Sequence, residues 1–106
     1  MTLQEFRDAL KTLGLPVYHY TANQQTGKYI AWHEYNTGGH HADNVRGSRV
    51  HSIQVDLFTR EEFDPLADQM EALLEKNGVA FDGPQTDYEE DTKYIHLWWD
   101  CEVPDA

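Results

Sequence analysis

The sequence predicts an α+β fold: a mostly antiparallel sheet of about four to five strands, with two helices packed on one face. Two segments repeat apolar residues at the spacing of a helix, whereas much of the remaining chain alternates apolar and polar residues with the two-residue period of a strand. Turn-forming residues separate these segments. With 106 residues, of which 40% are hydrophobic, the chain is expected to form a single domain, 1–106.

The first helix is predicted to begin at Thr2 and to end before Gly14. Thr2 and Glu5 fit a capping box, in which each side chain binds a free amide of the first turn. Gly14 favours the left-handed backbone that ends a helix, and Pro16 prevents the helix from resuming. The apolar stripe of this helix consists of Leu3, Phe6, Leu10 and Leu13.

The next two segments, 17–20 and 28–35, are rich in β-branched and aromatic residues, and the turn-rich run 23–27 lies between them. Together they predict a hairpin. The polar, glycine-bearing segment 36–47 follows and predicts a long exposed loop, which is a kind of segment that often carries function.

The third strand is predicted over 49–58, and a second helix follows it. Asp64 is expected to be the N-cap of this helix, with Pro65 at the first helical position. Lys76 complements the helix dipole in the last turn, and Gly78 ends the helix. One side of the strand carries His51, Ile53, Val55 and Leu57, and the buried stripe of the helix carries Leu66, Met70, Leu73 and Leu74.

The end of the chain predicts a second hairpin. Residues 79–81 open one strand, the acidic run 87–91 forms the turn, and 92–103 form the last strand. Alternation on the last strand separates two faces. One carries Ile95, Leu97, Trp99, Cys101 and Val103, and the other carries Tyr94, His96 and Trp98.

Charge excludes several classes of partner. Eight basic and nineteen acidic side chains give a net charge of −11, so a phosphate backbone or an anionic membrane would repel the chain. The sequence has no apolar run near the roughly 20 residues that span a bilayer, and its start does not resemble a secretory signal. Cys101 is the only cysteine, which favours a reducing, cytoplasmic origin. We therefore expect neither sequence-specific nucleic-acid binding nor membrane binding.

Six histidines raise the question of a metal. His40, His41 and His51, with Asp43 nearby, offer nitrogen and oxygen ligands of the kind that zinc binds. However, the sequence has no histidine pair at helical spacing on a predicted helix and no Cys-x-x-Cys motif. We expect His40 and His41 to be solvated and His51 to be hydrogen-bonded at the edge of the core, so no metal or other cofactor is predicted.

Catalytic motifs are also missing from the sequence. Cys101 belongs to the apolar alternation of the last strand, where burial should raise the pKa of its thiol. Ser48 and Ser52 lack the Gly-x-Ser-x-Gly context of a nucleophile, and Gly38 and Gly39 lack the spacing of a phosphate loop. The adjacent acidic residues lie in predicted turns, where they form a solvated face. The sequence therefore does not predict an enzyme.

The second face of the last strand is the candidate for binding. Trp98 is costly to expose to water, and Tyr29 and Tyr35 on the second strand are placed to extend a patch with Tyr94 and His96. Such a patch favours a partner surface. The alternative is that the second helix or a loop covers this face, and the sequence alone leaves both interpretations open.

Several strings in the sequence, in this order, resemble a known family. They are LQEFRDAL and GLPV of the opening helix and its end, YIAW of the second strand, ADNV of the loop, IQVDLFT of the third strand, LLE of the second helix and YIHLWW of the last strand. In their order and spacing over nearly the whole chain, they resemble the tail-terminator or tail-completion proteins of long-tailed bacteriophages and prophages. Each string alone is a weak signal.

The resemblance implies a non-enzymatic α+β subunit that forms a hexameric ring on the end of the tail tube. Such a ring stops tube growth and joins the tail to the head connector, so the implied partners are other copies, the tube protein and connector proteins. The implied location is the virion, at the head–tail junction, after synthesis in the bacterial cytoplasm. DNA would pass through the ring, where acidic residues would prevent it from adhering. The same charge could instead serve only solubility.

The resemblance also suggests which residues contact partners. Asp43 and Asn44 carry over as assembly residues, although His41 stands where the family often has an aromatic residue, and Gly38, Gly39 and His40 just upstream also depart from its pattern. The expected interface comprises His40, His41, Asp43, Asn44, Tyr94, His96 and Trp98. Two alternatives remain open: an acidic binding module of the inhibitor or immunity type, and, less favoured, a histidine-dependent metalloprotein.

Overall fold

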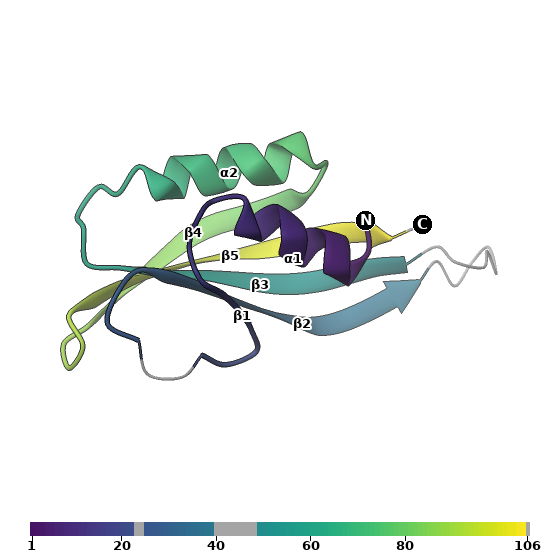
Figure 1. Cartoon of the computed structure of the whole chain (residues 1–106). Coiled ribbons are helices and arrows are strands. Elements are labelled where there is room, and N and C mark those ends of the chain that lie inside the picture. Colours follow the sequence, from purple (N-terminus) through teal and green to yellow (C-terminus); the bar gives the residue numbers. More distant parts are fainter. Residues whose placement is uncertain (23–24, 40–48, 106) are drawn as a thin grey trace.

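The structure, a computed structural model, describes residues 1–22, 25–39 and 49–105 (Figure 1). In chain order, the described elements are α1 (Leu3–Lys11), β1 (Val17–His19), β2 (Tyr29–Gly39), β3 (Arg49–Thr59), α2 (Leu66–Lys76), β4 (Ala80–Glu89) and β5 (Tyr94–Asp105). The five strands form one sheet in the order β1-β2-β3-β5-β4. Both helices lie on the same side of this sheet (Figure 1).

The predicted fold class is confirmed. Among the described strands, β1 runs parallel to β2, and every other pair of neighbours is antiparallel. The two long inner strands, β3 and β5, pair along eleven consecutive positions, from Arg49 opposite Asp105 to Thr59 opposite Ile95. This central pair provides the rigid base for both faces of the sheet.

The predicted hairpin between the first two strands is wrong. Val17 lies opposite Ile30 and His19 opposite Trp32, so β1 and β2 run in the same direction. Backbone bonds from Ile30 N to Pro16 O (2.9 Å) and from Tyr20 N to Trp32 O (2.7 Å) extend this pairing. The connection over 20–28 is long enough for the chain to return to the start of β1 before β2 begins, and a tight hairpin turn is not formed.

Two predicted turns are partly strand. β2 continues to Gly39 beyond a bulge between Glu34 and Asn36, so 36–39 belong to the sheet and not to the predicted loop. The remainder of that loop, 40–47, lies outside the described residues. The last hairpin likewise turns at 90–93, because β4 extends through Glu89. The acidic Asp87 and Glu89 are tolerated there because β4 is an edge strand whose side chains are mostly exposed.

The predicted start of the first helix is confirmed, whereas the second helix begins one residue later than predicted: Pro65, and not Asp64, is its N-cap, and Leu66 is its first residue. Thr2 and Glu5 form the capping box, with Thr2 N donating to Glu5 Oε1 (2.8 Å) and Glu5 N donating to Thr2 Oγ1 (3.1 Å). At the second helix, Asp64 Oδ1 accepts the first helical amide, from Leu66 N (2.9 Å), while Pro65 occupies the cap position with helical dihedrals. Both helices therefore begin with a free amide satisfied by a side chain.

The core lies between the helices and one face of the sheet. Phe6 and Leu10 of α1 and Met70 and Leu74 of α2 are buried against it. The strands contribute Ile30, Trp32, Ile53, Val55, Leu57, Trp99, Cys101 and Val103. Burial raises the pKa of the Cys101 thiol to about 12, as the alternation on the last strand predicted for a buried cysteine.

Candidate assembly interface on the helix-free face of the sheet

Tyr94, His96 and Trp98 lie on the face of the sheet that is opposite both helices. Their neighbours Trp99 and Cys101 belong to the core under the helices, and successive residues of a strand point to opposite faces. In the described part of the chain, neither helix covers this helix-free face (Figure 1). The sequence alone left open whether the second helix covers the face that carries Tyr94, His96 and Trp98, and the structure shows that it does not.

Aromatic rings cross the helix-free face from one edge strand toward the other. Tyr18 of β1 meets Tyr29 of β2 edge-on with centroids 6.0 Å apart, and Tyr29 stacks on Phe58 of β3 at 4.5 Å. Phe58 stacks in turn on His96 of β5 at 4.3 Å, and the rings of His96 and Trp98 are 4.9 Å apart. We call these five residues, together with Tyr94, the aromatic stripe. Such ring pairs add about 0.5–1.5 kcal/mol each beyond the area they bury.

Tyr94 is the buried member of the aromatic stripe. Its side chain is only 3% exposed, and its hydroxyl donates to the carbonyls of Gln25 (3.1 Å) and Gly27 (2.7 Å) just before β2. The Arg60 guanidinium lies 3.9 Å from the centre of the ring. Tyr94 thus joins the connection before β2 to the sheet, whereas Tyr29, Phe58 and Trp98 are partly exposed and available for contact. Partial burial raises the pKa of the Tyr29 phenol.

His96 ties the stripe to a buried carboxylate. Its Nε2 lies 2.7 Å from Oδ1 of Asp56, which is 7% exposed and also accepts a bond from Gln54 Nε2 (2.7 Å). A buried carboxylate without such partners would cost several kcal/mol. The pair is therefore structural as well as part of the face, and it fixes the orientation of the imidazole.

The other end of the helix-free face is acidic. A groove of about 350 Å³ there is lined by Tyr35, Ala80, Phe81, Asp82, Asp100 and Glu102. Tyr35 was expected to extend the aromatic patch, but it lies in this groove next to the bulge of β2, and it is 54% exposed. Burial, and then the charges of Asp100 and Glu102, raise the pKa of its phenol. The face is thus divided into an aromatic end and an acidic end.

The structure places the other candidate residues as follows. His40, His41, Asp43 and Asn44 lie outside the described residues. His51 is 4% exposed at the edge of the core, with Nδ1 2.9 Å from Thr37 Oγ1 and Nε2 3.0 Å from Asp105 Oδ2, as predicted.

Within residues 1–22, 25–39 and 49–105, no group of three His, Cys, Asp or Glu side chains is arranged to hold a metal. Neither described helix combines the length and apolar character needed to cross a bilayer.

Sequence reasoning did not single out Phe63, in the loop between β3 and α2. Its side chain is 93% exposed, and its backbone has a φ of 56°, in the left-handed region. The signal that could have found it is a large apolar residue enclosed by Glu62 and Asp64, outside any periodic pattern. A bulky side chain rarely adopts that conformation without a local cause.

No family model matches this sequence, and no curated protein matches it. A solved structure of the sheath/tube terminator of an extracellular contractile injection system, in the extended state, is similar to this chain, with a TM-score of 0.45 and 9% sequence identity. The alignment covers 99% of this chain and 56% of that one, so the chain spans just over half the length of the injection-system protein.

Proposed function

We propose that this chain is a structural protein of a phage or prophage tail. It assembles as a hexameric ring, caps the tail tube and joins the tail to the head connector, without catalysing a reaction. Its partners are further copies, the tube protein and connector proteins, and its place is the head–tail junction of the virion after synthesis in the bacterial cytoplasm. The ordered series of tail-terminator-like strings over nearly the whole sequence supports this proposal.

The helix-free face is the structural observation that carries the assembly part of the proposal. It presents Tyr29, Phe58 and Trp98 as partly exposed rings on neighbouring strands, and the ring of His96 links Phe58 to Trp98. Rigid aromatic side chains are typical anchors of protein interfaces because they lose little entropy on binding. We infer that this end of the face contacts a neighbouring subunit.

A ring also needs a second, different patch on each subunit, because head-to-tail contacts join unlike surfaces. By resemblance, that patch includes His40, His41, Asp43 and Asn44. The acidic end of the helix-free face, with Asp82, Asp100 and Glu102, is suited to a surface past which DNA slides, since like charges prevent the backbone from adhering.

The direct test is genetic. An amber mutation in this gene is expected to give heads and tails that do not join, or tails of abnormal length, and a plasmid copy of the gene should restore normal particles. Normal virions from the uncomplemented mutant would contradict the proposal.

The acidic groove also favours a second candidate, a binding module of the inhibitor or immunity type. Its three carboxylates would mask a basic partner in a one-to-one complex. Affinity purification of the native chain distinguishes the candidates. Recovery of one basic protein, without tail components, would favour the module, whereas recovery of tube and connector proteins would favour the tail protein.

A further inference from the structure

Phe63 is the most exposed of the large hydrophobic side chains described, at 93%, compared with 53–57% for Tyr20, Tyr35 and Tyr88. Its left-handed backbone, with a φ of 56°, disfavours an aromatic residue and would suit glycine. The position therefore combines two costs, an apolar ring in water and a strained backbone. Such costs persist where the surrounding structure imposes them, and they gather at binding sites.

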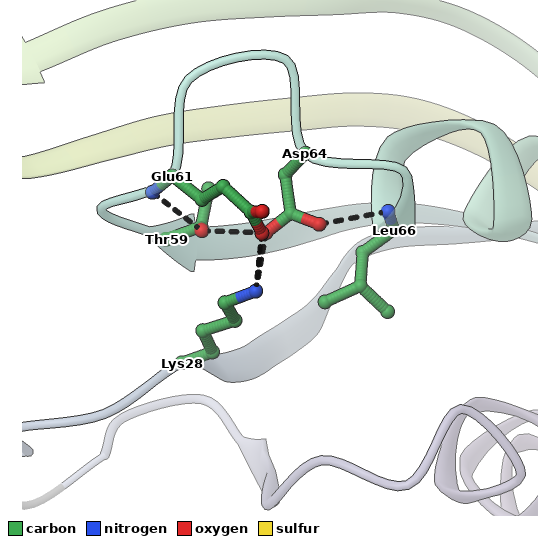
Figure 2. A network of polar contacts seen from close by, with 5 residues as sticks. All are labelled: Lys28, Thr59, Glu61, Asp64 and Leu66. Atoms are coloured by element: carbon green, nitrogen blue, oxygen red, sulfur yellow. Dashed lines mark hydrogen bonds and ion pairs between the residues drawn. The ribbon is translucent and has the colours of Figure 1, made fainter.

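A network of polar contacts holds the loop in this conformation (Figure 2). Thr59 Oγ1 donates to Asp64 Oδ2 (2.6 Å) and accepts from Glu61 N (3.1 Å), so the two ends of the loop are joined across Phe63. Lys28 Nζ lies 2.9 Å from Asp64 Oδ2 and donates to Glu61 Oε2 (2.7 Å). Asp64 is 7% exposed, which makes it the buried centre of the network.

Arg60 fixes the loop from the other side of the sheet. Its Nε donates to Thr92 O (2.9 Å), its Nη1 donates to Thr26 O, and its guanidinium lies over the ring of Tyr94. The loop is thus held on both sides of Phe63, at Arg60 by the carbonyls of Thr92 and Thr26 and at Asp64 by Thr59 and Lys28. A loop held in this way presents its exposed ring without the entropy cost of ordering a flexible segment on binding.

A groove of about 380 Å³ lies next to Phe63, on the side of the sheet that carries the helices. Its floor is apolar, because Ala67 of α2 and Ile95 and Leu97 of β5 line it. Tyr88, opposite Ile95 in the sheet register, is 53% exposed and extends the apolar surface. The groove and the ring together can bury an apolar side chain that enters from outside.

The charge of the groove identifies the kind of partner. Its eight lining residues are Glu61, Glu62, Phe63, Asp64, Ala67, Thr86, Ile95 and Leu97, which include the exposed carboxylates of Glu61 and Glu62, the buried carboxylate of Asp64, and no lysine or arginine. Lys28 neutralises only part of that charge, through Glu61 and Asp64. A second copy of a chain with a net charge of −11 would meet an acidic rim with a surplus of acid.

We propose that Phe63 and this groove form a docking site for a segment of a different protein, in which an apolar side chain is flanked by lysine or arginine. The ring of Phe63 covers the inserted apolar side chain, and the acidic rim pairs with the flanking cations. This docking site is independent of the proposed ring, because it lies on the side of the sheet opposite the aromatic stripe.

The test uses the full chain and three synthetic hexapeptides, followed by amide NMR titration. The first peptide has two central leucines flanked by lysines, the second replaces leucine with serine, and the third replaces lysine with glutamate. We expect the lysine–leucine peptide to bind with a Kd on the order of 1 mM and to shift the resonances of Phe63, Ala67, Ile95 and Leu97. Phe63→Ser should weaken this binding about tenfold, which is the loss expected for an interface anchor.

Tyr20→Ser provides the matched control, since Tyr20 is also an exposed aromatic residue with positive φ (74°) but lies at the β1 edge. It should leave binding unchanged. Equal binding of the lysine–serine peptide, unchanged binding by Phe63→Ser, shifts centred elsewhere, or no binding of the lysine–leucine peptide would each overturn the proposal. Self-association of the free chain that Phe63→Ser abolishes, measured by sedimentation, would overturn it in favour of a second copy.

Discussion

The aromatic stripe and the Phe63 loop expose aromatic rings in opposite ways. Rings of the stripe pack against one another across four neighbouring strands, so that each is partly buried by the next. Phe63 has almost no cover, and a polar network under it supplies the rigidity that packing supplies to the stripe. We therefore expect the stripe to contribute to stability as well as to the proposed contact, and the exposed ring of Phe63 to contribute to the proposed contact alone.

The largest expected effect concerns the anchor of the stripe. Tyr94→Ala should lower the free energy of unfolding by about 4 kcal/mol, because it removes a buried ring and the hydroxyl that serves the carbonyls of Gln25 and Gly27. Tyr94→Phe should cost about 1 kcal/mol, since only the hydroxyl is lost. Urea denaturation measures both values, and a loss below about 1 kcal/mol for Tyr94→Ala would contradict the anchoring role.

The network under Phe63 should have the next largest effect. Asp64→Ala removes the acceptor for Thr59, the first amide of α2 and Lys28, so we expect a loss of about 2 kcal/mol in urea denaturation. Glu62→Ala is the control, because the exposed side chain of Glu62 makes no hydrogen bond or ion pair with the described residues, and it should change stability by less than about 0.5 kcal/mol. Equal effects of the two variants would mean that the network does not hold the loop.

Acid should weaken the same network. Burial alone would raise the pKa of Asp64, but hydrogen bonds from Thr59, Leu66 and Lys28 together lower it below the ordinary value of 3.8. The hydrogen bond with His51 likewise lowers the pKa of Asp105. Because both pKa values are lower in the folded chain, the unfolded chain binds more protons, and the added stability is present above pH 3.8 and lost as the pH falls below it.

Urea denaturation midpoints measured over this acidic range show whether stability falls as the pH falls, and whether Asp64 is a source of that fall. Asp64→Asn should make the fall in stability shallower, since one of the contributing carboxyls is gone. A variant that falls as steeply as the native chain would show that the pH dependence arises elsewhere.

The smallest effect should be a gain. Phe63→Gly relieves the left-handed backbone and removes no buried contact, so it should raise the free energy of unfolding by about 1 kcal/mol. The same variant should lose binding of the lysine–leucine peptide. A destabilised Phe63→Gly variant would indicate that the ring of Phe63 contributes to stability. Phe63 would then not differ from the aromatic stripe in this respect.

Local signals in the sequence predicted much of the fold and the shared face of Tyr94, His96 and Trp98. The capping box of Thr2 and Glu5 and the alternation on β3 and β5 depend on neighbouring residues only, and both are reproduced. The direction of β1 depends on its pairing with β2, from which residues 20–28 separate it in the chain, and no local pattern encodes that pairing. The exposure of Phe63 could not be predicted for a similar reason. Its loop is held by contacts with Lys28 and Thr92, both of which lie far from Phe63 in the sequence.

Photocrosslinking from two positions tests the central claim, that the two aromatic surfaces serve different partners. A photoreactive phenylalanine analogue would replace Trp98 in one variant and Phe63 in the other, in the cells that make the native assembly. We expect position 98 to give a product of twice the chain mass of 12.3 kDa, and position 63 to become attached to a different, basic protein. Homodimer products from position 63, or none from position 98, would contradict it.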